Sequence, residues 1–436
     1  MKKAIILAAC ALMAGNCAFA QNRADGYYKD FFMDCGIPLN TFDDLPAASL
    51  LNLSMERLCT WEGGQADRAT DYEKQLMIDV FAGNEMDENG HLLYPDGSPR
   101  FKIIYINGGK ATAHGKYLTP KGLQNIRDFY NNGGSYIGTC AGAYICSRGV
   151  YNPTKDTVRL IPQYLGIWPG YVTGTGVNGK YPDCTVEKKC PLLKYYDFGG
   201  DLYIDSVRHN GGCYMSTYKA PKGTEILMRY VTIWPGRDTL GHNLHGQVNC
   251  WAYKASDKSG RLVVTGSHPE RGMNDERLQM FASMFKYALA GQGLPQVKAA
   301  LQNGETRKMT KGSADNDPAY AKLGDKQYHH FTIEVPKGTK SVTVDLAAVK
   351  GFENFDLYLY AANGKFAFNN VANWFNVASG VSKTLVVDNP KPGKLYISVF
   401  CDTTVDVINT KNGEQYTGRV DVLNGVPYTL TATINK

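Results

Sequence analysis

Cys140 lies in a collar of small residues, in the run Gly138-Thr139-Cys140-Ala141-Gly142. This G-x-C-x-G pattern is the cysteine form of the nucleophile elbow, a sharp turn between a strand and a helix. Because the turn is tight, the residues two positions before and after the cysteine must lack bulk. The start of a helix also offers free N–H groups that favour a thiolate. The pattern therefore indicates a nucleophile, with a buried core cysteine in a glycine-rich turn as the alternative.

A histidine and a carboxylate stand two residues apart in the run "TGSHPERG", where His268 and Glu270 flank Pro269. A residue before proline is pushed towards extended backbone, and side chains two apart in extended chain point the same way. Glu270 can then fix the tautomer of His268, and His268 can take or give a proton. Taken by itself, the run is also typical of a surface turn.

Two glycines, Gly108 and Gly109, follow another apolar run in "YINGGK". Their bare backbone can approach a substrate closely and offer an N–H to a developing oxyanion. The N–H of Ala141, next to the cysteine, faces the same bound carbonyl. We therefore expect an oxyanion hole formed by Gly108, Gly109 and Ala141.

The elements that must position these groups alternate between strands and helices up to about residue 290. The predicted strands are 102–106, 135–139 and 261–266, and the predicted helices are 120–131, capped by Thr119, and 274–290, capped by Asn274. This alternation predicts an α/β domain with a mainly parallel sheet and helices on both faces. The three chemical groups all follow predicted strands, and ligand sites of open α/β sheets form at that edge.

A further candidate for the substrate pocket is the run "RHNGG". It contains His209, Asn210, Gly211 and Gly212, and an ordinary turn is an equal alternative. We predict neither a metal nor a cofactor, because C-x2-C pairs and histidines at ligand spacing on a helix are missing.

Residues 291–436 have a different sequence pattern. Residues 291–325 are polar and irregular and read as a linker, so few contacts are expected to cross it. From 326 to 436, short alternating or β-branched runs such as "SVTVDL" and "KLYISVF" are separated by turn residues. This rhythm predicts an all-β sandwich.

The N-terminus reads as an export signal over residues 1–20, with Lys2 and Lys3, an apolar run and the A-x-A site Ala18-Phe19-Ala20. A lipoprotein reading is the minor alternative. The mature chain, 21–436, is then expected to be secreted or periplasmic, with the catalytic domain over 21–290 and no membrane-spanning segment.

Export makes disulfides feasible. Of the 11 cysteines, Cys10 and Cys17 lie in the signal segment, so nine remain. If Cys140 stays a free thiol, eight are left to pair, and Cys184 with Cys190 is the favoured local pair.

Composition excludes several classes of protein. Apolar residues make up 43% and charged residues 20% of the 436, which describes a globular protein rather than a disordered one. The net charge of +6 falls to +4 without Lys2 and Lys3, and no basic run points to nucleic acid.

Two resemblances follow from these residues. The region from about Phe101 to Leu289 resembles a class I glutamine amidotransferase-like domain, and "GTCAGAY" and "RHNGG" resemble the type at the N-terminus of eukaryotic biotin–protein ligases. That resemblance implies a doubly wound, flavodoxin-like sheet and a Cys140–His268–Glu270 triad. The C-terminal part resembles bacterial pre-peptidase C-terminal domains, in "FDLYLY", "GKLYISVF" and "VPYTLTATI". Such domains occur on secreted hydrolases.

The sequence thus favours a secreted cysteine hydrolase that cleaves an amide, γ-glutamyl or peptide bond of a small amide or peptide substrate. The β domain is expected to provide attachment to a cell wall or a glycan surface. The alternative is a non-catalytic binding or scaffold protein on an amidotransferase-like fold, with the β domain as the binding part.

Overall fold

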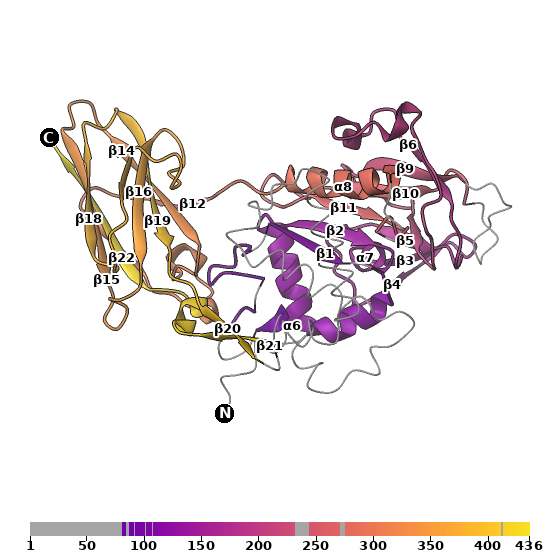
Figure 1. Ribbon diagram of the computed structural model, residues 1–436, viewed down its shortest axis with the longest axis horizontal. Coiled ribbons are helices and arrows are strands. Elements are labelled where there is room, and N and C mark those ends of the chain that lie inside the picture. Colours follow the sequence, from indigo (N-terminus) through magenta and orange to yellow (C-terminus); the bar gives the residue numbers. More distant parts are fainter. Residues whose placement is uncertain are drawn as a thin grey trace.

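The computed structural model describes the chain from residue 81 onward, with short gaps. The described residues are 81–83, 87–90, 92–100, 102–106, 108–231, 244–270, 275–410 and 413–436. They form two bodies, each with its own hydrophobic core (Figure 1). The predicted signal peptide, Cys35, Cys59 and the predicted cap Asn274 lie outside the described residues.

Three parallel strands form one side of the larger sheet. Strand β1 (Ile103–Ile106) pairs with β2 (Ser135–Thr139), and β2 pairs with β11 (Leu262–Thr265), in both cases in parallel. Every residue of these strands is buried. Strands covered on both faces require such continuous apolar runs, and the three predicted strands are confirmed.

Helices pack on both faces of these strands. Helix α6 (Ala111–Asn131) lies on one face and α8 (Asp275–Leu289) on the other, while the short α7 (Ala141–Ile145) follows β2 directly (Figure 1). The predicted cap Thr119 leaves helical geometry inside α6, with φ 61° and ψ 167°. The predicted helix therefore begins as expected after Thr119, but residues 111–118 add a helical stretch that the sequence did not predict, because Gly115 interrupts a run with few apolar residues.

The rest of this sheet runs mostly antiparallel. Its central path has the order β1-β2-β11-β10-β8-β5-β3-β4, with β9, β6 and β7 attached beside it. The additional strands are β3 (Gly149–Asn152), β4 (Thr157–Leu160), β5 (Tyr171–Gly174), β6 (Asp183–Val186), β7 (Tyr203–Ile204), β8 (Cys213–Met215), β9 (Glu225–Val231) and β10 (Val248–Tyr253). Among them only β3 and β5 pair in parallel.

The prediction of a mainly parallel, doubly wound sheet is therefore not confirmed, and the sheet is mixed. A parallel pair needs a crossover of a dozen or more residues, usually a helix. Between β3 and β9 the chain holds only the short 3-10 helices η2 (Pro191–Lys194) and η3 (Phe198–Gly200). Short loops such as the one that joins β3 to β4 lead instead to antiparallel pairing.

The C-terminal body is a sandwich of two sheets, as predicted. One has the order β12-β14-β19-β16-β17 and the other β13-β22-β15-β18. Their bounds are β12 (Val297–Ala300), β13 (Thr306–Met309), β14 (Tyr328–Val335), β15 (Ser341–Ala348), β16 (Leu357–Asn363), β17 (Trp374–Asn376), β18 (Lys383–Asp388), β19 (Gly393–Cys401) and β22 (Tyr428–Asn435). A hairpin of β20 (Asp406–Thr410) and β21 (Gly413–Thr417) and the 3-10 helices η4 (Ser313–Asp315), η5 (Pro318–Tyr320) and η6 (Val420–Asn424) complete it.

The prediction of a linker over 291–325 is wrong for most of that segment. Strand β12 pairs with β14 in one sheet, and β13 pairs with β22 in the other. Leu323 is fully buried and forms an isolated bridge with Val426. Polar residues dominate this segment because β12 and β13 are edge strands that expose much of their surface.

The expectation of few contacts between the bodies is also wrong. The segment 87–100, which precedes β1, carries Arg100, whose guanidinium forms an ion pair with Asp325 of the sandwich. Asp96 of the same segment accepts a hydrogen bond from Lys298 in β12. These side chains are buried or nearly so, and residues far apart in sequence thus join the two bodies.

The predicted Cys184–Cys190 disulfide is not present. Both residues are free thiols, as are the other described cysteines, Cys140, Cys146, Cys213, Cys250 and Cys401. The Sγ of Cys184 instead accepts a hydrogen bond from Asn249 at 2.7 Å inside the core. Apolar burial of these thiols replaces the expected cross-link.

Candidate active site

Cys140 occupies the turn between β2 and α7. Its backbone angles, φ 48° and ψ −101°, are rare for any residue other than glycine. Its N–H donates to the carbonyl of Thr265 at 2.9 Å, which ties the turn to β11. The side chain is 4% exposed. Backbone strain of this kind persists only where neighbouring structure enforces it, and it concentrates at functional sites.

The small residues around Cys140 are required by close backbone packing. A Cβ placed on Gly142 would overlap the carbonyl oxygen of Ile106 at the end of β1, and one placed on Gly138 would overlap the backbone of Gly142. The turn therefore fits only because these two positions carry no side chain, as the sequence pattern predicts.

His268 and Glu270 lie just beyond the end of β11. Nδ1 of His268 is 2.8 Å from Oε1 of Glu270. Burial lowers the pKa of His268, but the Glu270 carboxylate and a hydrogen bond with Cys140 outweigh burial and raise it to about 10. Since Nδ1 is engaged by Glu270, Nε2 is the ring nitrogen that remains for Cys140. The structure thus brings the three predicted residues into one row.

Thr139 and Tyr105 are members of the site that the sequence did not reveal. The hydroxyl of Thr139 donates to Oε1 of Glu270 at 3.0 Å, and the hydroxyl of Tyr105 lies 3.1 Å from that of Thr139. They extend the row of polar groups and hold the carboxylate in place. The available signal was a polar residue immediately before the cysteine, on the strand face opposite to it.

The structure places one of the three oxyanion-hole candidates, Gly108, against this row. A Cβ on Gly108 would overlap Cε1 of His268, so the glycine lets the backbone lie directly against the imidazole. Gly109 has a φ of 140°, a conformation that favours glycine. Ala141 is the first residue of α7, and the first N–H groups of a helix have no acceptor within the helix.

The run 209–212 also reaches the cysteine. Sγ of Cys140 lies 3.6 Å from the carbonyl oxygen of Asn210, to which the thiol can donate. The hydroxyl of Tyr144 donates to the carbonyls of Gly211 and Gly212, at 3.2 and 3.0 Å. The loop is therefore fastened to the elbow helix, with the backbone of Asn210 beside the sulfur.

His209 is a buried neutral support rather than a second proton carrier. Its Nε2 lies 2.7 Å from the hydroxyl of Thr175 and its Nδ1 3.2 Å from that of Tyr230. Burial, with a contribution from the nearby charge of His268, lowers the pKa of His209 to about 3. The ring thus stays uncharged at physiological pH and fixes the base of the 209–212 loop.

A thiol, an imidazole and a carboxylate in a row are the groups needed for nucleophilic attack on a carbonyl carbon. No group of three or more His, Cys, Asp or Glu side chains in the described part of the chain is placed to hold a metal ion. Across the same residues, no helix combines the length and apolar character needed to span a membrane.

Comparisons with known proteins assign both bodies to domain types. Residues 98–308 match the family model "Biotin-protein ligase, N terminal", and residues 327–400 match "Bacterial pre-peptidase C-terminal domain". Both resemblances inferred from the sequence are therefore confirmed.

Individual relatives are distant. An uncharacterized protein of Chlamydia muridarum is 24% identical over 171 residues, which are 39% of this chain and 60% of that protein's length. A crystal structure of a glutamine amidotransferase is 16% identical, with a TM-score of 0.29, and the match covers 50% of this chain and 94% of that one. The pre-peptidase C-terminal domain of a Bacillus anthracis collagenase is 12% identical, with a TM-score of 0.18, and the match covers 32% and 100%.

Proposed function

We propose that this chain, in which a domain of the biotin–protein ligase N-terminal type precedes a pre-peptidase C-terminal domain, is an exported cysteine-dependent amidohydrolase. Cys140 is the nucleophile, His268 the general base and acid, and Glu270 the residue that orients His268. Three observations support the proposal: the strained turn at Cys140, the hydrogen bond between His268 and Glu270, and the electrostatic coupling of His268 to Cys140.

In the first half of the reaction, Sγ of Cys140 attacks the carbonyl carbon of the amide, and the proton that the thiol has given up is held on Nε2 of His268. The new C–S bond leaves a tetrahedral intermediate with a negatively charged oxygen. When the C–N bond breaks, His268 returns the proton to the departing amine, and a thioester remains on Cys140. With a pKa of about 10, His268 already holds the proton at neutral pH, and Glu270 stabilises this imidazolium until the proton goes to the departing amine.

In the second half, water attacks the thioester and His268 removes its proton. The C–S bond then breaks, the acid product leaves, and the proton returns to the sulfur. Each cycle consumes one water and yields one amine and one carboxylic acid, so no other reactant is needed.

The oxyanion formed in both halves needs hydrogen-bond donors that are in place beforehand. Backbone N–H groups of Gly109 and Ala141 are proposed for this, with Gly108 allowing the loop to approach. His209, Asn210, Gly211 and Gly212 are proposed to form a wall of the substrate pocket, since the carbonyl of Asn210 faces the sulfur.

Export is supported by the C-terminal domain, whose type is common on bacterial extracellular proteins. The predicted signal peptide over residues 1–20 remains a prediction from the sequence. A binding role without catalysis is the second candidate, favoured by the low exposure of the Cys140 side chain, 4%.

The test measures hydrolysis of a panel of glutamine, γ-glutamyl and peptide amides by the full chain. Cys140→Ala should lower turnover by about 10³-fold or more, as expected when a nucleophile is removed. Cys146→Ala is the matched control, because Cys146 is fully buried close by in sequence and has no role in the reaction. Equal turnover by Cys140→Ala, or no turnover of any amide by the unmodified chain, would favour the binding role.

A further inference from the structure

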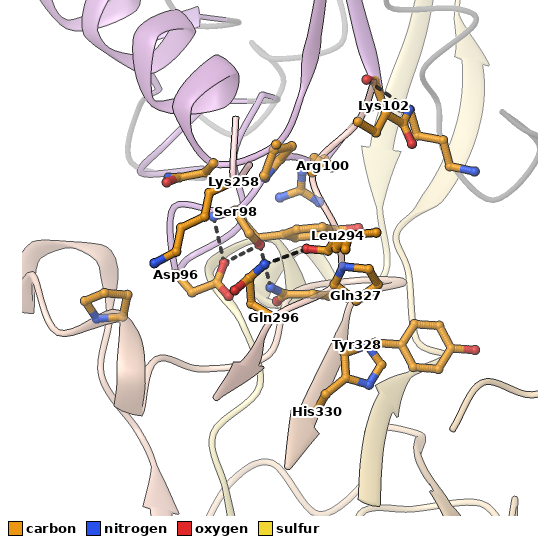
Figure 2. Close-up of a pocket in the computed structure, with 18 of the residues that line it drawn as sticks. Asp96, Ser98, Arg100, Lys102, Lys258, Leu294, Gln296, Gln327, Tyr328 and His330 are labelled. Atoms are coloured by element: carbon orange, nitrogen blue, oxygen red, sulfur yellow. Dashed lines mark hydrogen bonds between the residues drawn. The ribbon is translucent and has the colours of Figure 1, made fainter. Parts of the chain in front are cut away.

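A second site lies where the two bodies meet. A pocket of about 500 Å³ opens there, within the range of pockets that hold small ligands (Figure 2). On the α/β side it is lined by residues that precede parallel strands, among them Lys102 before β1, Gly133 before β2 and Lys258 before β11. The sandwich contributes the start of β14. We name this site the junction pocket.

An ion pair and several hydrogen bonds hold the wall of the junction pocket in place. The carboxylate of Asp96, 3% exposed, is paired with Lys298 and also accepts hydrogen bonds from the hydroxyl and N–H of Ser98. Gln327, at the start of the sandwich, donates to the Ser98 hydroxyl at 3.0 Å (Figure 2). Side chains from both bodies thus share one hydrogen-bonded network, which gives the pocket a fixed shape.

The lining favours a ligand rich in hydroxyl groups. Five residues with side-chain amides line the pocket, Asn131, Asn132, Gln292, Gln296 and Gln327. Asn132, Gln292 and Gln296 each donate one N–H to a backbone carbonyl and keep a second N–H and the amide oxygen for a ligand. An amide offers donors and an acceptor together, and so matches a hydroxyl, which is both. Tyr328 and His330 stand beside them as a stacked pair, with ring centres 5.7 Å apart and an interplanar angle of 8°. Burial lowers the pKa of His330 to about 4, so its ring is neutral.

The charge of the lining favours a ligand that is also negative. Five cationic side chains and one carboxylate line the pocket: Arg100, Lys102, Lys258, Lys298 and Lys326 against Asp96. Three of these cations form ion pairs within the protein: Arg100 with Asp325, Lys298 with Asp96, and Lys326 with Asp402. Lys258 is exposed at the rim, and no ion pair among the described residues involves it. A carboxylate on the ligand can therefore form a charge-assisted hydrogen bond with Lys258.

We propose that the junction pocket binds an acidic saccharide, a sugar chain that carries carboxylate groups. Amides and the Tyr328–His330 pair recognise ring hydroxyls and the sugar face, and the lysines at the rim recognise the carboxylate. An acidic peptide would also pair with the lysines, but it supplies few hydroxyls for the amides and no sugar face for the Tyr328–His330 pair, and the experiment below distinguishes the two ligands.

This site is separate from the reacting thiol. Parallel strands begin at one edge of a sheet and end at the other, and the junction pocket lies at the beginning of β1, β2 and β11. Gly133 and Cys140 are separated by seven residues along β2, which is roughly 23 Å of extended chain. A saccharide in the junction pocket would therefore hold the protein on a polymer without occupying the site of Cys140.

The experiment titrates the full chain with trigalacturonate and with the uncharged galactotriose by isothermal calorimetry. Trigalacturonate should bind about fivefold or more tightly than galactotriose, and Lys258→Glu should weaken it by about fivefold or more. Lys337→Glu is the matched control: Lys337 is also exposed but follows β14 at its far end from the pocket. Lys258→Gln, with a smaller loss, serves as the second variant if the charge reversal perturbs folding.

Several results would overturn the proposal. These are no binding of trigalacturonate, equal affinity for the two sugars, an unchanged affinity in both Lys258 variants, or tighter binding of pentaglutamate than of trigalacturonate. The rate of Cys140 alkylation, measured in parallel, should be the same with and without the sugar. This readout separates failure of the junction pocket from failure of the proposed hydrolysis.

Discussion

The two edges of the parallel strands β1, β2 and β11 are built in different ways. At the edge where the strands end, Cys140, His268 and Gly108 are packed so closely that a single Cβ would collide. At the edge where they begin, an open pocket is framed by ion pairs between two bodies. Close backbone packing suits groups that must react, and an open polar lining suits a ligand that is only held.

The same electrostatic principle acts at both edges. Burial lowers the pKa of His268, yet Glu270 and Cys140 raise it to about 10. Burial raises the pKa of Asp96, yet Lys298 and His329 lower it to about 2. In each case a nearby partner overrides desolvation. The partners differ in origin, because Glu270 is two residues from His268 whereas Lys298 lies 202 residues from Asp96.

The largest expected effect comes from separating the two bodies. A fragment that ends at Asp315 keeps β12 and β13 but loses the strands they pair with, and exposed unpaired strands promote aggregation. We expect this fragment to aggregate. The fragment that ends at Leu294 lacks both strands and should stay soluble, with a lower unfolding temperature than the full chain because Asp96 loses Lys298 and Arg100 loses Asp325.

Size-exclusion chromatography and thermal unfolding of the two fragments check this prediction. A fragment to Asp315 that is monomeric and as stable as the full chain would mean that the bodies are independent. The contrast between the two edges would then lose its basis, since the junction would be a loose contact.

A smaller effect is expected at the reacting edge. Gly142→Ala should lower the free energy of unfolding by about 3 kcal/mol, because the new Cβ would overlap the Ile106 carbonyl. Gly312→Ala is the control: its φ is −82° and the nearest atoms to an added Cβ are 3.8 Å away. It should change stability by less than about 0.5 kcal/mol. Equal effects in urea denaturation would show that the elbow has more room than the structure indicates.

The smallest expected effect is a change in the pH dependence of stability, which tests the electrostatic interaction between His268 and Glu270. A raised pKa of His268 in the folded state stabilises the fold fully below the unfolded value of 6.5, and this stabilisation is lost as pH rises towards about 10. Glu270→Gln removes the carboxylate that is the main cause of the raised pKa of His268. The unfolding free energy of the unmodified chain should exceed that of the variant by on the order of 2 kcal/mol at pH 6 and by less at pH 9.

Denaturant titrations between pH 6 and pH 9 measure this difference. Glu334→Gln, at an exposed position of the sandwich, should show no such pH dependence. A difference between the Glu270 variant and the unmodified chain that stays constant, or grows with pH, would contradict the assigned role of Glu270 in holding the proton on His268.

Features that depend on residues close together in the sequence could be predicted. The elbow around Cys140 and the spacing of His268 and Glu270 follow from short-range sterics, so they were visible in the sequence. The predicted strands and the sandwich likewise follow from apolar runs with a recognisable period. The role of Thr139 was not predicted, because a polar residue at the end of a strand, although it precedes the cysteine, does not identify its partner Glu270.

Features that depend on distant parts of the chain could not be predicted. The antiparallel part of the sheet follows from the lack of crossover helices between β3 and β9, which single runs do not reveal. The polarity of segment 291–325 predicts a linker, but the segment contains edge strands, which are polar, and their partners β14 and β22 come later in the chain. The junction pocket depends on ion pairs between residues such as Arg100 and Asp325.

The most direct test of the central claim is alkylation of the full chain with limiting iodoacetamide at pH 7, followed by peptide mapping. Burial raises the pKa of the Cys146 and Cys213 thiols well above the usual range, so these should stay unlabelled. The account predicts that Cys140 is modified first and that His268→Ala slows its modification. Labelling that avoids Cys140, or that is as fast without His268, would contradict the assignment of Cys140 as the nucleophile.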